Sequence, residues 1–218
     1  MFSPMTAGRH VPFQGFDPRD QVAVTRRRLP HWRQPSVTYF VTFHLADSLP
    51  QSLLGQWRDE RAIWLRWHPL PWRADEQREY EERFIRRMQE WLDAGMGDCH
   101  LRQPHVRAQV ELCLLHFDRK RCDLDAFVIV PNHVHALIKP AAGYDLSRLL
   151  QGIKGVSANR CNKMLGGKSA FWMDESYDHI VRDAKELAAF RNYIAANPAN
   201  ARLKPNEYSL QLRGVLLP

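Results

Sequence analysis

Hydrophobic and polar residues follow two different periods along this chain. Residues 36–45, SVTYFVTFHL, are mostly β-branched or aromatic, and residues 124–130, LDAFVIV, form a nearly continuous apolar run. Both patterns are typical of buried strands. A turn at Pro131 interrupts the second run before HVHALIK resumes it, which predicts an antiparallel hairpin. Residues 176–181 predict a further short strand, and residues 199–218 a loop with a last strand in SLQLRGVLL.

Five other segments show the helical period, in which apolar residues recur every three or four positions. Asp145 can cap one of these helices, Gly166 can stop it, and Asn197-Pro198 ends the last one. We expect the tryptophans of the first two segments to lie in the core. The predicted helices lie at 54–67, at 80–92, after Pro104, at 145–165 and at 185–196. The order of elements predicts an α+β fold with helices packed on an antiparallel sheet.

The chain divides into three parts. Residues 1–34 are rich in Pro, Gly, Arg and Gln, show no period, and end in a basic cluster. They predict a flexible arm, either solvated or following a nucleic-acid strand. Residues 35–205 predict one domain, and residues 206–218 a tail. A helical insertion at about 51–110 follows the first strand of the domain. This insertion can bind DNA, mediate dimerisation or shield a sheet face. Both a homodimer and a monomer are consistent with the sequence.

Composition narrows the class of protein. The 218 residues are 44% hydrophobic and 25% charged, which excludes disordered, collagen-like and fibrous chains. A net charge of +7 favours an anionic partner, either nucleic acid or phosphate. The four cysteines include no C-x-x-C pair, which argues against a thiolate zinc knuckle. No signal peptide and no membrane-spanning run is visible, so we expect a cytoplasmic chain with reduced thiols and no membrane contact.

Two histidines are the first candidate for chemistry. Because side chains alternate between the two faces of a strand, His133 and His135 point the same way and Val134 points to the opposite face. Two imidazoles on one strand face can clamp a metal ion. The alternative is a pair of half-buried strand histidines without a ligand.

The last predicted helix carries the second candidate. Tyr193 and Asn197 are four residues apart and therefore share one helix face. A tyrosine hydroxyl, with its usual pKa of about 10, is a useful nucleophile where a metal polarises the electrophile. Asn197 offers a neutral oxygen ligand, and oxygen donors suit Mg²⁺ or Mn²⁺. The alternative for Tyr193 is a packing residue with a solvated hydroxyl.

Four motifs together resemble a known family, the single-tyrosine HUH transposases, and most closely the REP-associated tyrosine transposases. The match covers roughly residues 36–48 and 110–205. The motifs are VTYFVTF, VIVPNHVHALI with its His-hydrophobic-His core, FWMDESYDHIVRD, and RNYIAANPANARL with its Tyr-x-x-x-Asn-Pro.

The resemblance implies a ferredoxin-like antiparallel sheet and a metal-dependent transposase acting on hairpin-bearing single-stranded DNA. By position, His133, His135 and Asn197 would hold Mg²⁺ or Mn²⁺ against the scissile phosphate. Tyr193 would attack phosphorus, form a 5′-phosphotyrosine link and free a 3′-OH, and a later attack by a 3′-OH would rejoin strands.

Basic residues surround the histidine motif in the sequence. Between Arg119 and Lys168, nine lysines and arginines face three aspartates. Such clustering near a phosphate site favours DNA binding, whereas a solvated helix face is the alternative for each residue. The candidate DNA-binding residues are Arg26, Arg27, Arg28, Lys139, Arg148, Lys154, Arg160 and Lys163.

Two other functions compete with a transesterase. A domesticated, non-catalytic protein would bind repeated hairpins without cleaving them. A two-histidine RNA phosphoesterase needs two His-x-Ser/Thr motifs. The chain has Thr42-Phe43-His44 in the reverse order and Ala136-Leu137 after His135, so the sequence does not support it.

Overall fold

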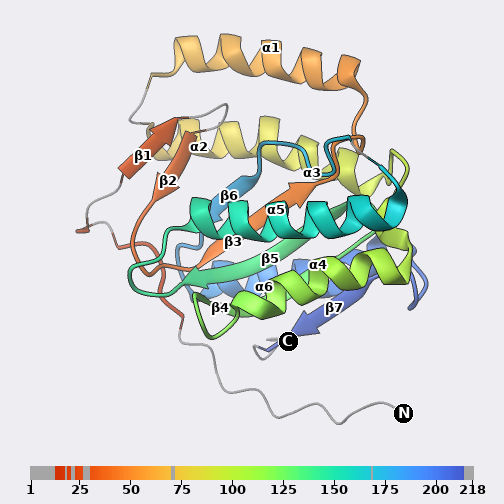
Figure 1. Cartoon of the computed structure of the whole chain (residues 1–218). Coiled ribbons are helices and arrows are strands. Elements are labelled where there is room, and N and C mark those ends of the chain that lie inside the picture. The colour runs from red at the N-terminus through yellow and green to blue at the C-terminus, as the bar shows by residue number, and fades with distance from the viewer. Residues whose placement is uncertain are drawn as a thin grey trace.

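The computed structural model describes residues 13–17, 19–20, 23–26, 30–69, 72–167 and 169–213. A five-stranded sheet with the order β6-β3-β5-β4-β7 forms the centre of the fold (Figure 1), and all its neighbouring strands are antiparallel. A separate two-stranded sheet pairs β1 with β2. The strands are β1 (Ala23–Arg26), β2 (Pro30–Arg33), β3 (Tyr39–His44), β4 (Cys122–Ile129), β5 (His133–Pro140), β6 (Tyr177–Ile180) and β7 (Ser209–Leu212).

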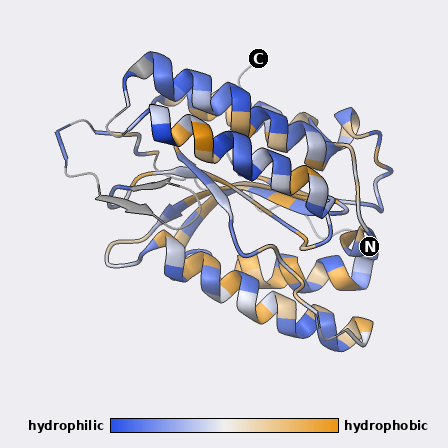
Figure 2. Ribbon diagram, turned by 90° about the horizontal axis from the view of Figure 1, so that it is seen from above, coloured by the Kyte–Doolittle hydropathy of each residue, from blue (hydrophilic) through white to orange (hydrophobic). Residues whose placement is uncertain are grey.

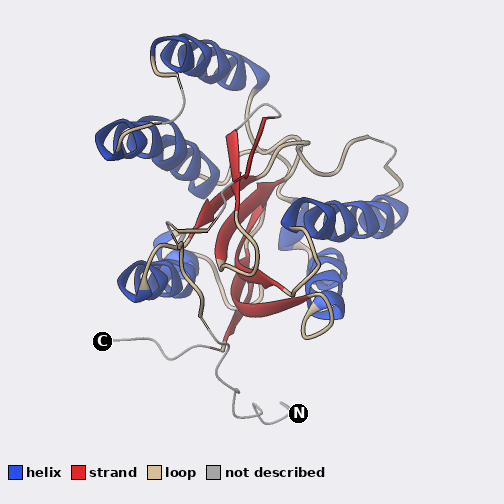
Figure 3. Ribbon diagram, turned by 90° about the vertical axis from the view of Figure 1, so that its left-hand side faces the viewer, coloured by secondary structure: helices blue, strands red, loops and turns tan. Residues whose placement is uncertain are grey.

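Helices cover both faces of the central sheet, as the edge-on view in Figure 3 shows. Two helices pack on one face, whereas α6 and the helical insertion lie on the other. The helices are α1 (Gln51–Trp67), α2 (Ala74–Tyr80), the π-helix η1 (Glu81–Arg86), α3 (Arg87–Asp93), the 3₁₀ turn η2 (His100–Arg102), α4 (Pro104–Phe117), α5 (Leu146–Leu165) and α6 (Ala184–Asn200). This arrangement confirms the predicted α+β fold with helices packed on an antiparallel sheet.

The strand period decides which core each residue of β5 joins. Val134, Ala136 and Ile138 point into the core beneath α4 and α5. Leu137 points to the other face and packs with Phe40 in the core beneath α6. Both cores exclude water from the sheet, which is therefore a rigid platform for side chains at the ends of its strands. Apolar segments recur along the helices on both sides of it (Figure 2).

A β-bulge in β4 links the sheet to α6. The register of β4 against β5 shifts between Leu124 and Ala126, so the side chain of Asp125 does not follow the regular alternation. Its carboxylate accepts two hydrogen bonds from Arg191, at 2.8 and 2.9 Å, and both side chains are buried. This bidentate ion pair fixes α6 on the sheet two residues before Tyr193.

The helical insertion has an apolar core of its own, which includes Trp57, Trp64 and Phe84. The helical spacing of the sequence predicted these contacts correctly. Trp67 is an exception because it is 76% exposed at the last position of α1. Val156 is likewise 44% exposed although it continues the apolar spacing of α5. Helical spacing places a residue on a face of its helix, but only the packing partners decide how far that face extends.

Two predicted features of the chain ends differ in the structure, and a third is confirmed. Within the predicted arm, β1 and β2 form a hairpin, which Arg33 fastens to Asp178 through bonds of 2.7 and 2.9 Å. No periodicity indicated it, because two four-residue strands are too short to show one. Helix α6 continues through Pro198 to Asn200, since a proline in the last turn leaves little helix to disrupt. The expected last strand exists as β7, paired with β4.

The four cysteines are free and buried, and burial raises the pKa of the Cys122 and Cys161 thiols to about 12. Within the described ranges, no helix has both the length and the apolarity that crossing a membrane requires.

Candidate active site

The two histidines of β5 meet at one point above the sheet. His133 and His135 lie on the α6 face, opposite Val134, as the strand period predicted. Their Nε2 atoms are 2.8 Å apart, and the side chains are 1% and 0% exposed. Two converging imidazole nitrogens in a buried position can hold a metal ion.

The other ring nitrogen of each histidine is already bound. The Nδ1 of His133 is 2.8 Å from the Oδ1 of Asn132, whose amide nitrogen donates to the carbonyls of Leu92 and Met96. Because Oδ1 can only accept, Nδ1 of His133 carries the proton, and a neutral ring keeps its lone pair on Nε2. The Nδ1 of His135 is 2.7 Å from the Thr42 hydroxyl. Both rings are therefore oriented by neighbours, as metal-binding histidines usually are.

Electrostatics favour a neutral imidazole at this point. Burial lowers the pKa of His135 well below 6.5, and the neighbouring His133 lowers it further. His44 faces His133 across β3 and β5, and burial is the main cause that lowers its pKa to about 4. A neutral ring is the form that binds a cation.

Helix α6 brings the tyrosine to the histidines. The Tyr193 hydroxyl is 3.3 Å from the Nε2 of His135, although 58 residues separate the two in the chain. The Asp125–Arg191 ion pair holds the helix one half-turn before Tyr193. Asn197, one turn later, is 1% exposed, and its buried Oδ1 atom has no hydrogen-bond partner among the described residues. An unpartnered buried oxygen is costly unless a ligand satisfies it.

Asp93, the last residue of α3, is the site member that the sequence did not reveal. Its Oδ1 is 3.4 Å from the Nε2 of His133 and accepts a 3.0 Å bond from Asn197 Nδ2. Its Oδ2 accepts a 3.3 Å bond from the Tyr193 hydroxyl. No sequence pattern pointed to Asp93, because it ends a charged helix and lies 100 residues from Tyr193 in the chain.

These residues fit a divalent cation. Ligand atoms of Asp93, His133 and His135 all lie within 4.8 Å of one another. The unpartnered Oδ1 of Asn197 adds a neutral oxygen donor nearby. Two nitrogens with carboxylate and amide oxygens are donors that Mn²⁺ accepts, and the oxygens also suit Mg²⁺.

The phenol is held in its protonated form. Burial raises the pKa of Tyr193 above its ordinary value of 10.0, and the negative charge of Asp93 raises it further. For Asp93 itself, burial raises the pKa of the carboxyl, whereas its hydrogen-bonding partners lower it. The contacts with His133, Asn197 and Tyr193 prevail and lower the pKa of the carboxyl. The nucleophile candidate is thus a neutral hydroxyl that donates to an anionic carboxylate.

A second electrostatic cluster anchors α6 at its other end. His179 of β6 lies between Glu186, the third residue of α6, at 3.0 Å and Glu81 of the insertion at 3.4 Å. Burial alone would lower the pKa of His179, but the two carboxylates prevail and raise it to about 9. The protonated ring therefore ties the insertion and α6 to the sheet.

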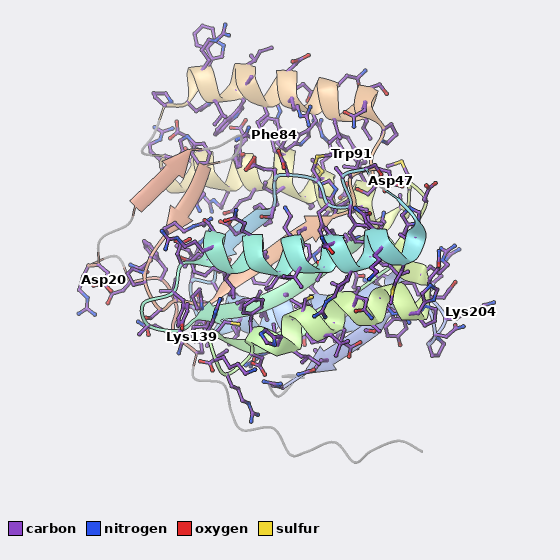
Figure 4. All side chains as sticks on the ribbon, in the orientation of Figure 1. Asp20, Asp47, Phe84, Trp91, Lys139 and Lys204 are labelled. Carbon is purple, nitrogen blue, oxygen red and sulfur yellow. The ribbon has the colours of Figure 1, made fainter. Side chains whose placement is uncertain are left out.

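The predicted DNA-binding residues that the structure describes lie at different distances from the histidine pair. Lys154 is close enough to His44, which faces His133, for its charge to lower the pKa of His44. Lys139 lies near the other end of β5, about 20 Å along the strand from His133; Figure 4 shows it far from Trp91 of the insertion. The candidates on α5 belong to a helix that packs on the α4 and α5 face of the sheet. These four are Arg148, Lys154, Arg160 and Lys163.

Among those four, Lys154 has a structural role, since its ammonium donates to the carbonyls of Met173 and Asp174. Arg160 and Lys163 are exposed. Arg26 ends β1, and Arg27 and Arg28 lie outside the described residues. Contact of these residues with DNA stays a prediction.

Comparison with known proteins bears on the same residues. The family model described as "Transposase IS200 like" matches residues 101–197, a span that contains His133, His135, Tyr193 and Asn197. No curated protein matches the chain.

A solved structure of a REP-associated tyrosine transposase bound to a REP hairpin is similar to the chain with 15% identity and a TM-score of 0.45. The alignment covers 87% of this chain and 94% of that one. The family match lies on the strands and the helix that build the site. Residues 101–197 are therefore similar to the IS200-like transposases.

Proposed function

We propose that this protein is a metal-dependent transesterase that cleaves and rejoins single-stranded DNA, with Tyr193 as the nucleophile. One observation carries the proposal: the Tyr193 hydroxyl lies 3.3 Å from the Nε2 of His135, which is itself 2.8 Å from the Nε2 of His133. A nucleophile and two metal-ligand candidates from distant parts of the chain thus converge on one point.

The covalent step needs no nucleotide cofactor, because one O–P bond forms as another breaks. The Tyr193 oxygen attacks phosphorus, a new O–P bond forms, and the bond from phosphorus to the 3′ oxygen breaks. The products are a 5′-phosphotyrosine and a free 3′-OH, so the phenol loses one proton and the departing oxygen gains one. Asp93 Oδ2 already accepts the hydrogen bond of the hydroxyl at 3.3 Å and can receive the phenolic proton.

His133, His135 and Asn197 would hold the divalent cation, Mg²⁺ or Mn²⁺. When bound, the cation neutralises charge on the non-bridging phosphate oxygens. Asn132 and Thr42 keep the imidazoles in position through hydrogen bonds of 2.8 and 2.7 Å. Phe40, stacked with His135 at 5.4 Å between ring centroids, closes the apolar side of the site.

Burial determines how a DNA strand would approach. The two histidines are covered, whereas Asp93 and Tyr193 are partly exposed. The strand would therefore enter from the side of these two residues. A cavity of about 300 Å³ lies between the insertion and the sheet and is lined by Thr42 and His44 among others. It leaves room beside the site for an unpaired nucleotide. An unpaired strand with a hairpin, which the family resemblance implies, is the substrate we propose.

A covalent adduct tests the proposal. The protein is incubated with Mn²⁺ and a library of 5′- or 3′-labelled hairpin oligonucleotides, and adducts are resolved on denaturing gels and assigned by peptide mass spectrometry. We expect an adduct on Tyr193 and none with Tyr193→Phe. Tyr144→Phe, which changes an exposed tyrosine, is the matched control. Salt-dependent hairpin binding without any adduct would instead indicate a domesticated DNA-binding protein.

A further inference from the structure

The end of α3 reaches the site in two independent ways. Asp93 contacts His133, Asn197 and Tyr193 directly. The carbonyls of Leu92 and Met96 hold the amide of Asn132, which in turn holds the Nδ1 of His133. The helical insertion therefore does more than shield the sheet, because it sets the orientation of one histidine and adds a carboxylate beside it.

The two oxygens of Asp93 have different partners. Oδ1 lies 3.4 Å from the Nε2 of His133, the nitrogen whose lone pair faces the centre of the site. Oδ2 accepts the hydrogen bond of the Tyr193 hydroxyl. One oxygen is thus directed at the point where the imidazole nitrogens converge, while the other stays with the nucleophile.

The charge of Asp93 lacks a permanent counter-charge. Among the described residues its three partners are an imidazole, an amide and a phenol, and none of them is a lysine or an arginine. A carboxylate that is only 32% exposed loses much of its hydration. A divalent cation between the carboxylate and the two imidazoles would supply the missing positive charge.

We infer that Asp93 is a ligand of the divalent cation, so that the helical insertion completes the metal site together with His133, His135 and Asn197. The inference rests on the proposed function, since it concerns the same cation. The four motifs that carry the family resemblance all lie outside residues 51–110. The inference therefore gives the insertion a role that these motifs do not predict. The occupied site would then carry one carboxylate, two imidazoles and one amide oxygen.

Binding of Mn²⁺ alone tests the inference without any DNA. Free Mn²⁺ is followed by electron paramagnetic resonance during titration of the full chain. We expect Asp93→Asn to weaken Mn²⁺ binding at least about tenfold. Glu90→Gln, a change of an exposed carboxylate one turn earlier on α3, should leave the affinity within about twofold.

Two further variants separate the outcomes. Asp93→Glu keeps a carboxylate, so its Mn²⁺ affinity should exceed that of Asp93→Asn; no difference between them would overturn the inference. His133→Ala should abolish binding. If His133→Ala binds as the parent does, the metal site itself is refuted and with it the proposed function. If only His133→Ala loses binding while Asp93→Asn retains it, Asp93 is not a ligand.

The rate of adduct formation distinguishes a metal ligand at Asp93 from a carboxylate that blocks the site. An Asp93→Asn chain that keeps its Mn²⁺ affinity and forms the Tyr193 adduct faster than the parent would show that the carboxylate blocks the site. That outcome also overturns the inference. Slower adduct formation together with weaker Mn²⁺ binding supports it.

Discussion

The two faces of the central sheet use the same strands for different purposes. On the α4 and α5 face, Val134, Ala136 and Ile138 of β5 join an extended apolar core. On the other face, the neighbouring His133 and His135 meet Tyr193 of α6 and Asp93 of the insertion. The first face stabilises the fold mainly by burying apolar surface, whereas the second face also positions polar groups that need specific partners.

Distance along the chain does not predict which elements share a face of the sheet. Helix α5 follows the histidine strand directly and carries four of the predicted DNA-binding residues, yet it covers the apolar face. Asp93 lies forty residues before His133 and touches it. A crossover helix returns to the sheet on the side that its connection dictates, not on the side where the chemistry lies.

Loss of a histidine is expected to have the largest effect on the chemical face. His133→Ala or His135→Ala should reduce the Tyr193 adduct at least about 100-fold. Each variant removes one of the two imidazole nitrogens that we propose as ligands of the cation. The measurement is the initial rate of adduct formation with Mn²⁺. His105→Ala, on the exposed first turn of α4, is the control. An unchanged rate in either histidine variant contradicts the role of this face.

Substitutions on the α4 and α5 face should instead change the free energy of unfolding. Ile138→Ala removes a fully buried side chain and should lower the free energy of unfolding by about 2–5 kcal/mol. Urea unfolding measures the loss, and Val156→Ala, at a half-exposed position of α5, should change it by less than about 0.5 kcal/mol. Adduct formation per folded molecule should stay unchanged. A rate that falls with Ile138→Ala would show that the two faces are coupled.

The His179 cluster predicts a pH dependence on the chemical face. The pKa of His179 is about 9 in the folded chain against 6.5 for an unperturbed ring. The stabilisation is therefore fully present below about pH 6.5 and is lost as the pH rises through 9. We expect a loss of about 2–3 kcal/mol, measured by urea unfolding at pH 6 and pH 9.5. His179→Gln should flatten this dependence; an identical pH slope in both chains refutes it.

The smallest effect is expected from the exposed cations of α5. Each residue that contacts a phosphate of single-stranded DNA contributes about 0.7 to the slope of log affinity against log salt. Because α5 lies on the apolar face, the double variant Arg160→Gln/Lys163→Gln should change the slope by less than that. A change of about 1.4 would show that DNA wraps onto this face, as the sequence alone suggested.

Periodicity predicted much of the site. Alternation along β5 placed His133 and His135 on one face, and the spacing of four placed Tyr193 and Asn197 on one side of α6. These relations are local, because backbone geometry fixes them within one element. For the same reason the core positions of β3 to β5 and of most helices follow from the sequence.

How separate elements meet cannot be read from local patterns. Sequence patterns were enough to predict most strands and helices and the paired functional groups on β5 and α6, since these depend on hydrogen bonds and apolar spacing within a few residues. The contact of Tyr193 with His135, the arrival of Asp93, the side on which α5 packs and the exposure of Trp67 depend on which surfaces bury each other across the fold. Burial is a property of the whole packed chain, and no local pattern contains it.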